Sequence, residues 1–189
     1  MSKKKNRSDS SLNKQKATTQ HRSRSSLVLD AVKEIVGADA IPLVQILLKK
    51  DSVSEYELSD RIKKDINQTR NILYALHKLN LVTSVRKKDK IKGWYIYYWT
   101  FDADRLMLLY KAIQKKRLEQ LNSILEREEK HSFFSCPNRC MRVDYEQAMS
   151  FNFKCPECGA LMDREDNQER IAELKREIER IKQTLTKIT

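Results

Sequence analysis

The hydrophobic pattern predicts a helix followed by a two-stranded hairpin near the middle of the chain. Apolar side chains recur at helical spacing over residues 66–79, with Asn67 as a suitable N-terminal cap and Asn80 as a stop. Alternating patterns typical of strands follow over residues 81–85 and 94–98, on either side of a charged turn. A helix that leads into a hairpin is typical of a winged helix-turn-helix, in which the hairpin forms the wing.

The second strand of this hairpin is unusually aromatic, because it holds both tryptophans of the chain and three of its seven tyrosines. A strand sends alternate side chains to opposite faces, so one set is expected to cover the core. The predicted core set is Trp94, Ile96 and Tyr98, and the predicted outer set is Tyr95, Tyr97 and Trp99. The outer set is either buried by other parts of the domain or free to dock on a protein or stack on unpaired bases.

Three shorter helices are predicted ahead of this hairpin unit. The first is an apolar stripe over residues 27–36 that Gly37 can end. The second has Pro42 in its first turn, and the third begins at Ser54, which makes a capping box with Glu57. These helices complete a winged helix-turn-helix domain.

Two long amphipathic helices are predicted in the second half of the chain. Residues 102–130 contain neither glycine nor proline and carry apolar triplets at helical spacing, which predicts a long linker helix. After Asp166 a heptad stripe runs to Ile188, but a helix of this length is marginal alone. The linker helix is the nearest partner for that stripe, in an antiparallel pair. A homodimer and a separate subunit are the alternatives.

The most specific chemical motif lies between these two helices. It contains all four cysteines of the chain as two short pairs, Cys136 with Cys140 and Cys155 with Cys158. Such pairs, separated by a hairpin-length spacer, are typical of a tetrahedral Zn²⁺ site with four thiolate ligands. A disulfide framework is the alternative, but no secretory signal supports it. A closed thiolate shell has no open position for substrate, so we expect one structural zinc.

The spacer between the cysteine pairs predicts the small antiparallel sheet of a zinc ribbon, because Met141, Val143 and Tyr145 alternate and Phe151 and Phe153 follow. The predicted fold is therefore multidomain and mainly α. Its parts are a disordered basic tail (1–26), an α+β winged helix-turn-helix domain (27–101), a linker helix (102–131), a four-cysteine zinc ribbon (132–165) and an amphipathic C-terminal helix (166–189).

Composition narrows the classes of function. A chain of 189 residues, 34% charged and 40% hydrophobic, can hold one or two small domains plus helices but no large enzyme core. It lacks a glycine-rich phosphate loop, so we expect neither a nucleotide-driven activity nor an enzyme. No apolar run reaches the length of a membrane span and the N-terminus has no apolar signal region. A cytoplasmic, nucleoid-associated protein without a membrane partner is therefore expected.

Positive charge is concentrated in the tail, which carries seven of the twelve net positive charges. A flexible basic arm attracts the phosphate backbone of nucleic acids without reading sequence. The alternative is a solvated extension that only aids solubility.

The candidate interaction surface is the wing, because it places cations beside aromatic rings that can attract phosphate and stack on bases. Its predicted members are Lys87, Lys88, Lys90, Lys92, Trp94, Tyr95, Tyr97 and Trp99. The helix at residues 66–79 has only Arg70 and Lys78 as cations, so weak direct readout of base edges is expected. Replacing Arg70 by alanine is accordingly expected to change function little.

The order of winged helix, linker helix and four-cysteine ribbon, with the segments KIKGWYIYYW and CPECGALMDREDN, resembles the alpha subunit of archaeal transcription factor E. That family is the counterpart of the large subunit of the eukaryotic general initiation factor IIE. The resemblance covers roughly residues 27–170. The chain departs from the family pattern in the three residues that separate Cys136 from Cys140 and in its longer basic tail.

The resemblance implies a general transcription initiation factor that is not an enzyme. Such a factor binds the clamp and stalk of RNA polymerase in the preinitiation complex, near promoter DNA bound by TATA-binding protein and factor B, and favours DNA opening. A beta subunit is a further candidate partner. The resemblance maps the residues of the wing, Trp94 to Trp99, and the four cysteines as functional. The alternative function is a sequence-specific winged-helix repressor that dimerises through its C-terminal helix.

Overall fold

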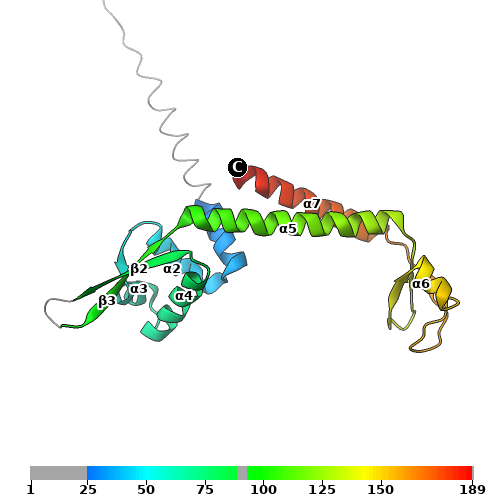
Figure 1. Ribbon diagram of the computed structural model, residues 1–189, viewed down its shortest axis with the longest axis horizontal. Helices are drawn as coiled ribbons and strands as arrows, with labels where there is room; N and C mark the ends of the chain where they lie inside the picture. Colours follow the sequence, from blue (N-terminus) through cyan, green and yellow to red (C-terminus); the bar gives the residue numbers. More distant parts are fainter. Residues whose placement is uncertain (1–24, 89–92, 189) are drawn as a thin grey trace, which may run out of the picture. The chain divides into compact units, whose positions relative to one another are not determined.

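The computed structural model describes residues 25–88 and 93–188 and divides into two compact units between Tyr110 and Lys111 (Figure 1). Most of the predicted tail lies outside the described residues, as do Lys90 and Lys92 of the predicted wing surface. The part of the chain that is described contains no helix long and apolar enough to cross a membrane.

The helices of the first unit begin and end at residues whose local chemistry explains the boundary. They are a first helix over residues 25–35, the 3-10 turn η1 (Ala38–Ala40), α2 (Ile41–Leu47), α3 (Glu55–Ile62) and α4 (Ile66–Lys78). The predicted capping of α3 is confirmed, because the Ser54 side chain accepts a hydrogen bond of 3.2 Å from the backbone N–H of Glu57.

The predicted cap of α4 is wrong by two positions. The carboxylate of Asp65 accepts a hydrogen bond of 2.8 Å from the backbone N–H of Asn67, so Asp65 is the N-cap and Asn67 lies inside the helix. The predicted stop at Asn80 is confirmed. Asn80 has a positive φ of 55°, and the N–H of Leu81 donates to the carbonyl of Leu76 across the end of the helix.

The wing belongs to a sheet of three antiparallel strands rather than two. The strands are β1 (Val53–Ser54), β2 (Val82–Lys88) and β3 (Tyr95–Phe101), in the order β1-β3-β2. Strand β1 pairs only Val53 with Trp99 and Ser54 with Tyr98. A strand of two residues has too few positions to produce an alternating pattern, and β1 is therefore absent from the sequence-based prediction.

The burial of β3 differs from the prediction at both tryptophans. Trp99 and Phe101 are buried, with exposed fractions of 3% and 8%, whereas Trp94 is 56% exposed. Trp99 and Phe101 therefore face the core, and Ile96 and Tyr98 lie half-buried on the other face. Tyr95 and Tyr97 alternate in register with Trp99 but are exposed, nearer the turn of the hairpin. In a strand made almost entirely of large apolar residues, alternation does not reveal which face is inside, and packing decides it.

Trp99 is buried against α4. Its ring makes edge contacts with the rings of Tyr74 and His77, at centroid distances of 6.4 and 6.0 Å. The prediction that Trp99 docks on a partner therefore needs correction. Its side chain is part of the core of the first unit, called the winged-helix unit from here on, and not of the free surface of that unit.

The second unit contains a helical pair, as predicted. Helix α5 (Ala103–Lys130) crosses the division between the units. Within the second unit, α7 (Gln168–Ile188) runs antiparallel to the part of α5 that begins at Lys111 (Figure 1). Lys175 pairs with Glu129 at 2.7 Å, and Arg117 pairs with Glu177. Ile178 and Ile181 of the heptad stripe are buried within the same chain.

The ribbon lies in the chain between these two helices. Its strands are β4 (Phe133–Ser135), β5 (Arg142–Asp144) and β6 (Asp163–Arg164), in the order β5-β4-β6. The spacer between the cysteine pairs forms only one of these strands. The prediction is wrong after Asp144, whose side chain accepts from the N–H of Gln147 and begins helix α6 (Tyr145–Ser150). Phe151 and Phe153 follow in a turn, not in a strand.

Candidate metal centre and wing surface

The two cysteine pairs come together at one point of the ribbon. The Sγ atoms of Cys136, Cys140, Cys155 and Cys158 all lie within 4.8 Å of one another, and those of Cys136 and Cys158 are 3.4 Å apart. A tetrahedral shell with zinc–sulfur bonds of about 2.3 Å places its sulfurs about 3.8 Å apart. The four side chains therefore fit a single zinc ion with small adjustments.

Each pair of cysteines lies on its own tight turn, and the two turns bring the four sulfur atoms together. In the second turn, Gly159 has a φ of 74° and its N–H donates to the carbonyl of Cys155 at 2.7 Å. In the first turn, Arg139 has a φ of 57° and its N–H donates to the carbonyl of Cys136 at 2.8 Å. The extra residue before Cys140 is absorbed by this left-handed residue, so the departure from the family spacing leaves the four-sulfur cluster complete.

The thiols of the cluster have pKa values that are shifted in opposite directions. A hydrogen bond from the Asn138 side-chain amide, 3.4 Å from Cys158 Sγ, and another from the backbone N–H of Ala160 lower the pKa of Cys158 to about 6. Hydrogen bonding to Cys158 raises the pKa of Cys140 to about 12. The protein alone thus favours one thiolate and disfavours a second. A divalent ion supplies the positive charge with which all four thiolates can coexist.

The predicted ligands are therefore brought together, and no other histidine or acid of the described residues joins them within the same cluster. His131, which is near Cys136 in the sequence, lies exposed at the end of α5. Four sulfurs complete a tetrahedral shell, so the arrangement suits a structural ion that holds two turns together.

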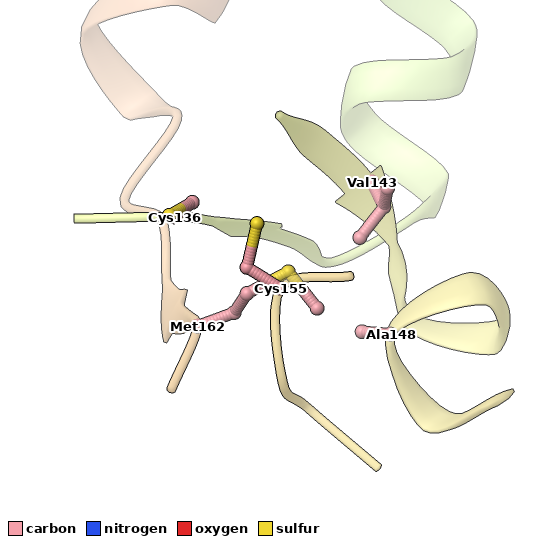
Figure 2. Close-up of a cluster of buried hydrophobic side chains, with 5 residues drawn as sticks. All are labelled: Cys136, Val143, Ala148, Cys155 and Met162. Atoms are coloured by element: carbon pink, nitrogen blue, oxygen red, sulfur yellow. The ribbon is translucent and has the colours of Figure 1, made fainter. Parts of the chain in front are cut away.

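The sulfur cluster also forms much of the ribbon's small core. Figure 2 shows Cys136 and Cys155 converging with the side chains of Val143, Ala148 and Met162. Two of the five buried members are thus cysteines of the proposed site. A core this small buries too little apolar surface to be stable alone. The ribbon is expected to depend on its metal.

The exposed part of the wing combines aromatic rings with cations. Trp94, Tyr95 and Tyr97 are 56%, 52% and 40% exposed. The guanidinium carbon of Arg86 lies 4.0 Å from the centre of the Tyr95 ring, within cation–π range. Of the predicted cations, Lys87 and Lys88 are exposed on β2.

Sequence reasoning missed two members of this surface. Arg86 was not among the predicted wing residues, and Tyr74 of α4 is 56% exposed beside Trp99. The ring of Tyr97 also neighbours the same indole, with ring centroids 6.5 Å apart. The exposed aromatic surface therefore continues from the wing onto α4. No spacing within either segment could reveal this, because the contact joins residues far apart in the sequence.

Arg70 is held inside the winged-helix unit. Its guanidinium donates to both carboxylate oxygens of Glu55, at 3.0 and 2.7 Å, and the Glu55 side chain is only 4% exposed. Hydrogen bonding to Glu55 raises the pKa of Arg70 above its usual value. This arginine joins α3 to α4. It is therefore not available to read base edges, although the sequence alone presents it as a free cation of the helix.

The family model described as the TFIIE alpha subunit matches residues 26–132. Transcription factor E from Pyrococcus abyssi is 33% identical over 159 residues, covering 84% of both chains. Transcription factor E from Archaeoglobus fulgidus is 33% identical over 161 residues, covering 84% of this chain and 91% of the relative. Among solved structures, a MarR transcriptional regulator from Methanosarcina mazei has a TM-score of 0.34 and 17% identity, and covers 75% of this chain and 92% of that chain.

Proposed function

The chain belongs to the TFIIE alpha subunit family, and from that premise we propose that it binds RNA polymerase in the preinitiation complex and promotes promoter opening. Family membership supports a general transcription factor associated with the transcription machinery. The finer role is our inference from the surfaces that the fold leaves exposed. TATA-binding protein, factor B and promoter DNA near the transcription bubble are the further partners proposed, with a beta subunit as a candidate.

The observation that carries the proposal is the exposed aromatic and basic surface of the wing. Tyr95 and Tyr97 offer ring faces that stack on unpaired bases, while Arg86 and Lys88 attract phosphate. Stacking on single-stranded bases stabilises the opened duplex over the closed one, because paired bases are already stacked on one another. A surface of this kind therefore favours opening without hydrolysing a nucleotide.

The helix that would read a DNA groove supports the same conclusion. Arg70 is engaged with Glu55, so the other lysine or arginine of α4 is Lys78, in its last turn. Residues at the N-terminal end of a recognition helix are those that reach base edges. At that end α4 carries Asn67 and Gln68 and no cation, which favours a factor positioned by polymerase over a sequence-specific reader.

The repressor alternative depended on a free heptad stripe in the C-terminal helix. Ile178 and Ile181 of that stripe are buried within the chain, in the unit that contains the contacts of α7 with α5. We therefore retain the initiation factor as the proposed function. We further propose that the protein is not an enzyme, since the four cysteine sulfurs would complete the shell of a bound zinc and leave no position for substrate.

Replacing Tyr95 and Tyr97 together by alanine is expected to reduce promoter opening tenfold or more. Each stacked base contributes about 1–3 kcal/mol, and 1.4 kcal/mol corresponds to about a tenfold change in the opening equilibrium. Permanganate reactivity of unpaired thymines measures the opened fraction in a system reconstituted with RNA polymerase, TATA-binding protein and factor B.

The matched control for this double variant is Tyr56→Ala. Tyr56 lies on α3 and is 51% exposed, so the control removes an equally exposed ring from a helix and not from the wing strands. Lys78→Ala tests the recognition helix without disturbing a buried ion pair. Opening that depends more on Lys78 than on the two wing tyrosines would contradict the proposed mechanism. Circular dichroism of each variant establishes that the fold is intact.

A further inference from the structure

A buried charge cluster lies where the ribbon meets the helical pair. Its centre is Glu128 near the end of α5, whose side chain has no exposed surface. Arg142 of β5 donates to both carboxylate oxygens of Glu128, at 3.0 and 2.8 Å. Asn167, just before α7, donates to the Glu128 side chain at 2.9 Å and to its backbone carbonyl at 2.8 Å. One carboxylate thus joins α5, the ribbon and the start of α7.

Two further contacts hold Arg142 in place from within the ribbon. Its Nε donates to Glu165 at 2.8 Å, and its guanidinium carbon lies 3.8 Å from the centre of the Phe133 ring. Arg170 of α7 also reaches Glu128, at 3.2 Å. Burial alone raises the pKa of Glu128, but the hydrogen bonds and charges of Arg142, Asn167 and Arg170 outweigh it and lower the pKa. The carboxylate is therefore ionised and needs these partners.

Arg142 is held by strands that lead directly into the cysteine cluster. Arg142 follows Cys140 by two residues, and Ser135, its partner on β4, immediately precedes Cys136. The N–H of Cys136 donates to the carbonyl of Met141 at 3.0 Å, which closes the first cysteine turn. The short strands that carry Arg142 and Phe133 rest on the core that the cysteines share (Figure 2). Without metal that core is too small to hold them.

We propose that the contact of Glu128 with Arg142 couples the metal state of the ribbon to the stability of the helical pair. With metal bound, Arg142 is held against Glu128 and the ribbon and the helical pair form one rigid unit. Loss of the metal releases Arg142, removes two charge-assisted hydrogen bonds from Glu128 and loosens the adjoining turns of α5 and α7. The inference rests on the metal site being occupied, and the experiment tests that separately.

The experiment measures amide hydrogen exchange in the full chain, with zinc bound and after chelation. Zinc content is measured first, because a chain that does not bind one zinc would overturn the proposal at its premise, an outcome distinct from a zinc-bound chain without coupling. Chelation is expected to raise exchange at the adjoining ends of the helical pair, residues 121–130 and 168–176, roughly tenfold, as expected for losing hydrogen bonds to a charged group. Unchanged exchange in these residues on chelation would overturn the proposal.

Variants separate this contact from a general effect of the ribbon. Glu128→Gln keeps the shape but removes the charge, so exchange in residues 168–176 is expected to become nearly independent of zinc. The matched control is Glu126→Gln on the same helix, which removes an exposed pair with Lys130 and should keep the full response to chelation. Should Glu128→Gln fail to fold, Arg142→Lys removes the two-point contact while keeping the charge. A full zinc response in the folded variant would overturn the proposal.

Discussion

Replacing Cys155 by serine is expected to release the metal and unfold the ribbon, roughly residues 132–165, while the winged-helix unit stays folded. Structural zinc contributes on the order of 10 kcal/mol to domains of this kind, which is more than the five-member core of the ribbon can replace. The winged-helix unit keeps its own core, which includes Leu43, Leu58 and Leu73, all with no exposed surface. Metal analysis and two-dimensional NMR of the full chain measure both parts of the result.

The matched control for this variant is Ala148→Ser. Ala148 is fully buried in the same cluster as Cys155, so the control introduces a hydroxyl into the same core but leaves all four sulfurs in place. It is expected to destabilise the ribbon and to keep one zinc per chain. Retention of a full equivalent of zinc by Cys155→Ser would contradict the four-cysteine site.

Replacing Arg70 by alanine is expected to destabilise the winged-helix unit by about 3–5 kcal/mol, because it leaves a buried carboxylate without its partner. That carboxylate belongs to Glu55, which is 4% exposed and receives two hydrogen bonds from Arg70. Urea unfolding followed by circular dichroism measures the change in the free energy of unfolding. This substitution is therefore unsuitable as a neutral test of the recognition helix, and Lys78→Ala takes its place.

Two comparisons make the Arg70 result specific. Arg61→Ala removes an exposed ion pair with Glu57 and is expected to cost less than about 1 kcal/mol. Combining Arg70→Met with Glu55→Gln removes both charges together, and the double variant should recover part of the loss seen in Arg70→Ala. Equal destabilisation by Arg61→Ala and Arg70→Ala would show that the Glu55 contact contributes nothing beyond a surface pair.

Local chemistry in the sequence determined most of the element boundaries. The Ser54 cap, the stop at Asn80 and the heptad stripe of α7 each depend on residues within a few turns of one another. The four cysteines likewise identified a common site by their spacing, because two tight turns need only a few residues each. The family also followed from motifs that are continuous in the chain. In each case the interactions are short-range, so the order of residues specifies them.

Only the tertiary structure decided which face of each element is inside and which charges are paired. Trp99 alternates with Tyr98 in a strand in which five of seven residues are aromatic, and the contact with α4 selects Trp99 for the core. Arg70 reads as a surface cation until α3 places Glu55 beside it, 15 residues away in the chain. Glu128 is one acid in a charged helix, and its burial requires Arg142 from β5 and Asn167 from the segment just before α7. Burial and ion pairing depend on long-range packing, and hydrophobic periodicity within one segment contains no information about its partners.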